Sequence, residues 1–190
     1  MRIDYAGIGD RLPNPETPDE ATLEAYGAFA FLYLRSRAHR GLPLELARRM
    51  IQPALDWGLF HVIRDAHGVP RAGVTWAWLD PDAQSRHAAG EILSPGDWRS
   101  GANFWVMELI APFGQETGSA VACWLRRTLP ASIRRVNYLR YTPDQTRVAR
   151  IVTCTRGPND QWRARLLTAE ELQGLDAPHD LATLPVRGRA

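Results

Sequence analysis

The sequence contains no lysine, so each of its 23 basic residues is an arginine. The base composition of the gene is one explanation, because alanine, proline and arginine are all abundant. A functional reason for the absence of lysine stays open beside this one. The net charge is only +2, which gives no strong overall field for a polyanion. We therefore expect no nucleic-acid partner.

Cysteine is also scarce. The chain has only Cys123 and Cys154, far apart in the sequence and in no C-x-x-C motif. This excludes a zinc ribbon and a thioredoxin-like redox motif. We expect two structural thiols in a reducing compartment, and no metal.

Long hydrophobic runs are missing as well. The longest, Tyr26 to Leu34, is far shorter than the ~20 residues that span a bilayer. The first residues have the features of neither a secretory signal nor a transit peptide. We therefore expect no integral membrane segment and a cytoplasmic protein.

The overall composition is that of a globular chain. Of 190 residues, 45% are hydrophobic and 23% are charged, which suits one domain with a substantial core. We expect a single domain over residues 1–190, with an irregular lead-in over 1–16 and a loosely ordered tail over 177–190.

Two helices are predicted first. Thr17-Pro18-Asp19-Glu20 has the pattern of a capping box with proline at the first helical position, which predicts a helix from Pro18 to about Ala38. Its spacing suggests a core face formed by Leu23, Tyr26, Ala30 and Leu34 and widened by Phe29, Phe31 and Tyr33. A second helix is predicted from about Pro43 to Trp57, with Pro53 as a possible kink.

The rest of the chain is rich in strand patterns. Residues 59–64 and 72–79 predict a hairpin, and residues 83–93 a connection with a short helix. A buried strand from Asn103, a helix over 116–129, and strands over 133–141, 148–155 and 162–167 follow, and Thr168 to Glu171 open a last short helix. This order predicts an α+β fold with a mostly antiparallel mixed sheet.

The strand that begins at Asn103 carries one carboxylate, Glu108, among apolar residues. A buried carboxylate costs several kcal/mol unless a partner offsets it. Gly114 and Gly118 follow in a loop that leads into a helix, an arrangement that often holds an anionic group. Pairing with one of the many arginines is the alternative role for Glu108.

Several separated blocks resemble one family, the RTX toxin-activating lysine acyltransferases. The resemblance runs from about Arg35 to Gly157. It rests on blocks in a fixed order, namely Ser36-x-x-His39-Arg40 with Pro43, Ile51-x-Pro53-Ala54, Arg64-Asp65 with Pro70, Trp76-Ala77, Asp97-Trp98-x-Ser100-Gly101, Trp105, and Ile110-Ala111-Pro112-Phe113-Gly114.

The resemblance implies a GNAT-like fold and transfer of a fatty acyl chain from acyl-carrier protein to an internal lysine of a protoxin. It implies a catalytic pair in which the histidine is His39. The family has an aspartate where this chain has Glu108, which keeps the charge but is one methylene longer. No tightly bound cofactor is implied, because the acyl-carrier thioester is a co-substrate.

Chemistry and resemblance together suggest roles for these residues. A lysine amine, with a pKa of about 10.4, must lose a proton before it attacks a thioester; His39 can accept it and Glu108 can orient the imidazole or contact the amine. A covalent acyl-histidine intermediate is the alternative. For the donor we expect contacts from Ile110, Ala111, Gly114, Gly118 and Arg40.

The partners follow from the same reasoning. Carrier protein is acidic, so we expect it to dock on arginines, either Arg35, Arg37, Arg40, Arg48 and Arg49 or Arg126, Arg127, Arg134 and Arg135. The acceptor is a lysine-containing protein, either an RTX protoxin or a small peptide, and a homodimer is possible. Two other functions stay open: a non-catalytic carrier-binding module, and a coenzyme A-dependent acetyltransferase, against which the absence of a Q/R-x-x-G-x-G/A loop argues.

Overall fold

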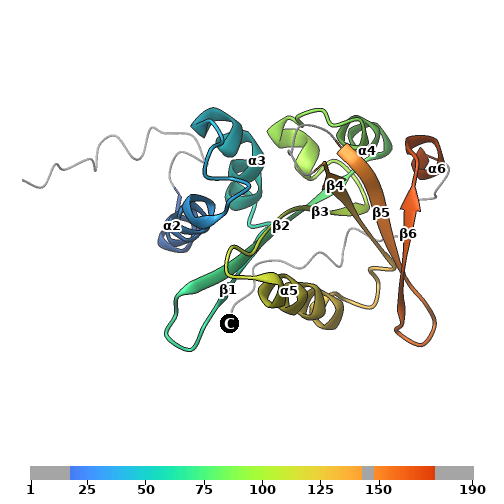
Figure 1. Cartoon of the computed structure of the whole chain (residues 1–190). Coiled ribbons are helices and arrows are strands. Elements are labelled where there is room, and N and C mark those ends of the chain that lie inside the picture. Colours follow the sequence, from blue (N-terminus) through green and yellow to red (C-terminus); the bar gives the residue numbers. More distant parts are fainter. Residues whose placement is uncertain (1–17, 143–147, 174–190) are drawn as a thin grey trace, which may run out of the picture.

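The computed structural model describes residues 18–142 and 148–173, so the expected lead-in and tail lie outside the described residues. Its centre is a six-stranded sheet in the order β1-β2-β3-β4-β5-β6 (Figure 1). All neighbours are antiparallel except β3 and β4, which are parallel. The prediction of an α+β fold with a mostly antiparallel mixed sheet is confirmed. The strands are β1 (Phe60–Arg64), β2 (Pro70–Leu79), β3 (Asn103–Ile110), β4 (Arg135–Tyr141), β5 (Val148–Arg156) and β6 (Trp162–Leu167).

Helices cover both faces of this sheet. In Figure 1, α5 lies below the sheet, whereas α2, α3 and α4 lie above it. The helices are α2 (Glu20–Arg35), α3 (Leu44–Asp56), α4 (Pro81–Ala88), the single 3-10 turn η1 (Pro95–Trp98), α5 (Gln115–Thr128) and α6 (Ala169–Gln173). The predicted capping box of α6 is present, since Thr168 Oγ1 accepts from the Glu171 backbone and Glu171 accepts from the Thr168 backbone.

The first helix differs from its prediction at both ends and in its buried face. Asp19 is the N-cap and accepts a hydrogen bond from the Thr22 backbone at 2.8 Å, and the helix ends at Arg35 rather than Ala38. The predicted core residues Leu23, Ala30 and Leu34 are exposed, and Tyr26 is only partly buried. Phe29 and Tyr33, expected at the margin of the core face, are buried. The buried face is formed by Thr22, Ala25, Ala28, Phe29, Leu32 and Tyr33.

Gly73 on β2 explains which face of α2 is buried. The run from Tyr26 to Leu34 is apolar on all sides, so periodicity alone does not select a face. Gly73 leaves room for Phe29 and Leu32, because a Cβ at that position would lie 2.8 Å from the Phe29 ring. The helix therefore turns these two side chains toward β2 and leaves Leu34 outside.

The Asp97–Gly101 block is a structural turn. Arg86 of α4 donates two hydrogen bonds to Asp97, at 2.8 and 3.1 Å, and Trp98 is buried. Ser100 Oγ accepts from the Asp80 backbone at 2.9 Å. Gly101 packs so closely on Asp80 that any Cβ there would overlap its backbone. This block fastens α4 and η1 to the end of β2.

Candidate active site

An irregularity in β3 sets the position of Glu108. Thr75 of β2 pairs with Glu108, but the next residue, Trp76, pairs with Val106, so Met107 is an extra residue. Such a bulge breaks the simple alternation of side chains along a strand. As a result, Met107 and Glu108 both line the same cavity.

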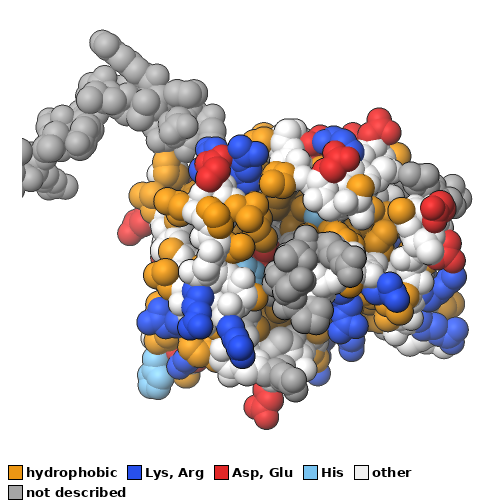
Figure 2. All heavy atoms as spheres, turned by 45° about the horizontal axis from the view of Figure 1, so that its top comes forward, with side chains coloured by type: hydrophobic (Ala, Val, Ile, Leu, Met, Phe, Trp, Pro, Cys, Tyr) orange, Lys and Arg blue, Asp and Glu red, His pale blue; other side chains and the backbone are white. Residues whose placement is uncertain are grey.

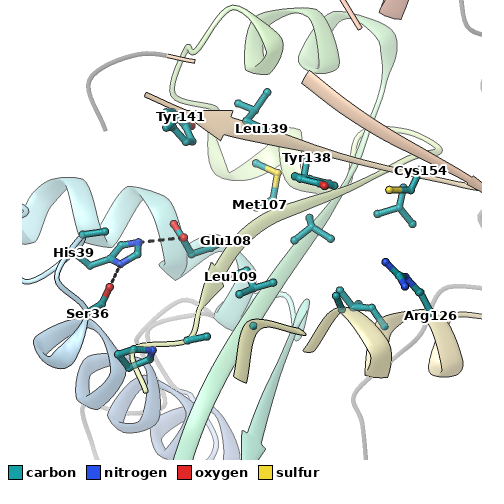
Figure 3. A pocket seen from close by; sticks show the side chains of 18 of the residues that line it. Ser36, His39, Met107, Glu108, Leu109, Arg126, Tyr138, Leu139, Tyr141 and Cys154 are labelled. Atoms are coloured by element: carbon teal, nitrogen blue, oxygen red, sulfur yellow. Dashed lines mark hydrogen bonds and ion pairs between the residues drawn. The ribbon is translucent and has the colours of Figure 1, made fainter. Parts of the chain in front are cut away.

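The parallel strands β3 and β4 separate just beside this bulge. Their ladder contains only the pairs Trp105 with Asn137 and Val106 with Tyr138. Beyond these pairs, β3 continues to Ile110 and β4 to Tyr141 without pairing to each other. The strands form two walls of an opening, with Met107 and Glu108 on one wall and Leu139 and Tyr141 on the other (Figure 3).

This opening is a cavity of about 830 Å³, within the range of small-molecule sites. Its lower wall comes from α5, and Arg126 of that helix also lines it. Most of the lining is apolar, and the side chains that face the interior include Val106, Met107, Leu125, Leu129, Val136 and Leu139. A long apolar group therefore finds an apolar environment here.

The turn after α2 positions His39. Ser36 is the C-cap of α2, and its backbone N–H donates to the Leu32 carbonyl at 2.9 Å. The Ser36 carbonyl then accepts from the backbone N–H groups of His39 and Arg40, at 3.1 and 2.9 Å. These bonds fold the chain back tightly, so that Ser36 and His39 face the same cavity.

His39 and Glu108 meet at the cavity wall although they lie 69 residues apart in the sequence. His39 Nε2 lies 3.2 Å from Glu108 Oε1, and His39 Nδ1 lies 2.6 Å from Ser36 Oγ (Figure 3). The two side chains are only 11% and 13% exposed. Since an ionised carboxylate only accepts hydrogen bonds, Nε2 carries the proton in the neutral ring. Nδ1 then accepts from the Ser36 hydroxyl.

Two tyrosines surround the pair. The Tyr33 ring packs on the His39 ring at 4.7 Å between centroids. Burial, and to a lesser extent the Glu108 carboxylate, raise the pKa of Tyr33 and the pKa of Tyr141. Both phenols therefore stay neutral at physiological pH.

The expected site residues fall into three groups. His39 and Glu108 are in contact, and Ala111, Gly114 and Gly118 line the same cavity. Ile110 is 1% exposed and packs with α2 and α3 instead. Arg40 lines a second cavity, described below. Gly114 has a φ of 116°, a conformation that side chains other than glycine rarely adopt.

Ser36 was predicted only as part of the Ser36-x-x-His39 block, with no role in the chemistry. The signal was its spacing from His39, since residues three apart across a tight turn can touch. Tyr141 carried no comparable signal, because its approach to Glu108 depends on how β4 diverges from β3.

The two expected arginine groups are only partly available to a partner. Glu45 holds both Arg48 and Arg49, Arg35 lies over the Phe31 ring at 3.6 Å, and Arg135 is buried. Arg37 and Arg126 line the first cavity. These two are the arginines best placed to meet a ligand that enters it.

His87 and His61 pack against tryptophan rings outside this site. His87 is buried against Trp105, and burial lowers its pKa to about 4. His61 stacks on Trp124 at 4.1 Å, and His67 is exposed in the β1–β2 turn. His179 lies outside the described residues.

Cys123 and Cys154 are both free thiols, and Cys123, which we expected to be structural, is exposed. Cys154 lines the first cavity, and burial raises its pKa. Across residues 18–142 and 148–173, no group of histidine, cysteine and carboxylate side chains is arranged to hold a metal ion. In the same part of the chain, no helix is long and apolar enough to cross a membrane.

The chain is similar to several known proteins. The model of the RTX toxin acyltransferase family matches residues 19–155. The protein-lysine palmitoyltransferase CyaC of Bordetella bronchiseptica is 29% identical over 163 residues, which are 82% of this chain and 85% of that protein. The lysine-acyltransferase RtxC of Vibrio cholerae is 34% identical over 102 residues, covering 53% and 65% of the two chains. Among solved structures, a GNAT-like decarboxylase, GphF, in complex with isobutyryl-CoA aligns over 62% of each chain with 21% identity and a TM-score of 0.41.

Proposed function

The chain belongs to the RTX toxin acyltransferase family, and from this premise we propose that it moves a fatty acyl group from acyl-carrier protein to the side-chain amine of an internal lysine of a protoxin. One observation carries the proposal. The His39–Glu108 pair stands at the wall of a large apolar cavity, so a proton acceptor lies beside a space that suits an acyl chain. The names of the relatives, a lysine palmitoyltransferase and a lysine-acyltransferase, support the same reaction.

The donor enters between the diverging ends of β3 and β4. The backbone groups that face each other beyond Val106 and Tyr138 are not paired across this gap. Such groups are costly to leave unpaired, and the amides of a phosphopantetheine arm can pair with them. The acyl chain then lies among the apolar side chains of α5 and β4. Arg37 and Arg126 provide positive charge for an acidic carrier.

The arm's phosphate is assigned to the start of α5. Gly114 and Gly118 line the cavity there, and the first N–H groups of a helix favour an anion. Glu116 in the same turn weakens this attraction, so we expect the phosphate to contribute less to donor binding than the apolar lining does.

His39 is the general base in this proposal. Glu108 accepts from Nε2–H, which fixes the tautomer and leaves the lone pair of Nδ1 available. The proton of the lysine amine can reach Nδ1 directly, when the Ser36 hydroxyl turns away. It can also be relayed by that hydroxyl, which takes the amine proton while donating its own proton to Nδ1. Glu108 then stabilises the imidazolium. The glutamate's extra methylene is accommodated, since its carboxylate reaches the ring at 3.2 Å.

The transfer then has three parts. The lysine nitrogen bonds to the thioester carbonyl carbon, the carbon–sulfur bond breaks, and the proton held by His39 passes to the leaving thiolate. The negative charge that develops on the carbonyl oxygen needs backbone N–H donors. Ala111 lines the cavity at the end of β3, and we assign its N–H to this role.

Intact-mass spectrometry tests the proposal. The protein is incubated with palmitoyl-carrier protein and an RTX protoxin, beside matched reactions with palmitoyl-coenzyme A. We expect an acyl mass on the protoxin with the carrier donor, and a loss of rate of about 10²–10⁴-fold for His39→Ala. Acylation with coenzyme A alone would overturn the assignment of the donor. Binding of the carrier without transfer to any lysine would favour a non-catalytic binding module.

A further inference from the structure

A second cavity lies between α2 and α3, on the other side of His39. Its volume is about 680 Å³, and it runs along the helix pair down to Asp56, which accepts a hydrogen bond from Tyr26 at 2.7 Å. Most of its lining is apolar, including Leu23, Ala30, Leu34, Leu44, Ala47 and Ile51. The cavity lies here because Leu23, Ala30 and Leu34 of α2, which were predicted to be buried, face outward beside α3.

Several leucines at this cavity are largely exposed. Leu23, Leu34 and Leu44 are 57%, 71% and 85% exposed. Figure 2 shows hydrophobic side chains gathered on the part of the surface that α2 and α3 form. Contiguous exposed apolar surface on a globular protein commonly marks a binding site.

The two cavities meet at one residue, because His39 lines both of them. A group in the second cavity therefore reaches the imidazole without displacing an acyl chain from the first. We propose that the second cavity, the α2–α3 groove, binds the lysine-bearing segment of the acceptor protein. This inference rests on the proposed function and adds where the acceptor lies.

The lining of the groove indicates the chemistry of that segment. Apolar walls call for apolar side chains on both sides of the reactive lysine. Arg40 lines the groove and has no ion-pair partner among the described residues. Since it lies next to His39 in the chain, an acidic residue near the lysine would pair with it and offset its repulsion of the incoming ammonium group. The occupant is thus a lysine flanked by apolar residues, with an acidic residue close by.

With the acceptor in the groove and the donor in the first cavity, each proton and each product has its own route. The ammonium group gives one proton to solvent as it approaches, and the neutral amine gives a second to His39 as the nitrogen–carbon bond forms. The carrier leaves as a thiol, by way of the first cavity. Neither product needs to pass the other.

Surface substitutions at the groove test the proposal. The variants are Leu34→Arg and Leu44→Arg, and Leu166→Arg on β6 is the matched control, since Leu166 is 58% exposed and lines neither cavity. The probe is a fluorescent peptide with a single lysine, leucines on both sides and one aspartate, compared with the same peptide carrying serines in place of the leucines. Binding is measured by anisotropy, and KM for peptide and for palmitoyl-carrier protein by initial rates.

We expect each groove variant to raise the Kd and KM of the leucine peptide at least tenfold, while the KM of the donor stays unchanged. The control should change neither value, and the serine peptide should bind at least tenfold more weakly than the leucine peptide. Unchanged peptide binding in both groove variants would overturn the proposal. A higher donor KM would assign the groove to the carrier protein, and a dimer that becomes a monomer in light scattering would assign it to a second copy of the chain.

The peptide's binding separates this inference from the proposed function. In one outcome, the wild-type protein shows no acylation, yet it binds the leucine peptide and the groove variants do not. The proposed function then fails, and the proposed acceptor groove stands. If acylation proceeds and the variants have no effect on the peptide, the function stands and the groove fails.

Discussion

The turn at Asp97 and the candidate active site each hold a carboxylate, and the two carboxylates differ in how completely their hydrogen-bonding capacity is filled. Asp97 accepts two hydrogen bonds from Arg86 and two more from the Ser94 backbone and hydroxyl. Glu108 accepts one bond from His39, at 3.2 Å, on the wall of a cavity. The first carboxylate has its hydrogen-bonding capacity filled by its own turn, whereas the second keeps capacity for a substrate. A family motif can therefore mark either stability or chemistry, and the surroundings decide which.

The largest effect should come from removing the charge at the cavity. Glu108→Gln keeps the size of the side chain but can no longer fix the His39 tautomer or stabilise the imidazolium. We expect kcat to fall by about 10²-fold or more, with little change in the free energy of unfolding. Initial rates and urea denaturation measure the two quantities. A variant that kept full activity would show that Glu108 is only structural.

Ser36→Ala should have a smaller effect on rate. It removes the hydroxyl that lies 2.6 Å from His39 Nδ1 but leaves the ring and Glu108 in place. We expect kcat to fall by about tenfold, the low end of a proton-transfer contribution. A loss as large as that of His39→Ala would instead indicate that Ser36 itself carries the acyl group, which a covalent adduct in the mass spectrum would reveal.

A change in the turn at Asp97 should lower stability rather than rate. Asp97→Asn removes the charge that binds Arg86, and we expect a loss of about 1–2 kcal/mol in the free energy of unfolding, since one side of the pair is solvent-exposed. The rate per folded molecule should stay the same, because this turn lines neither cavity. A fall in kcat as large as that of Glu108→Gln would show that Asp97 also contributes to the chemistry.

The smallest effect should appear in acid. Arg86 lowers the pKa of Asp97 to about 2, below the value of about 3.9 for an unfolded aspartate. The ionised carboxylate therefore contributes stability above pH ~4, and this contribution is lost as the pH falls toward 2. Urea denaturation of the protein and of Asp97→Asn over this range should show their difference shrinking. A difference that stayed constant would mean that the charge of Asp97 does not matter.

Much of the architecture could be predicted from local pattern. The β1–β2 hairpin, β3 and the capping box of α6 all have chemistry that acts within a few residues. The glycine loop is shorter than predicted, because Gly114 is the N-cap of α5 and Gly118 lies inside that helix. Within the site, the resemblance identified His39 and the carboxylate position, because the blocks around them are distinctive.

The buried face of α2, the bulge at Met107 and the divergence of β3 from β4 were decided only in three dimensions. An all-apolar helix has no preferred face until Gly73 offers room to Phe29 and Leu32, and strand register depends on a partner distant in sequence. The sequence by itself determined which side chains are available for chemistry. Tertiary structure decided that His39 and Glu108 meet, and that two cavities meet at His39, because such contacts join segments that no local rule connects.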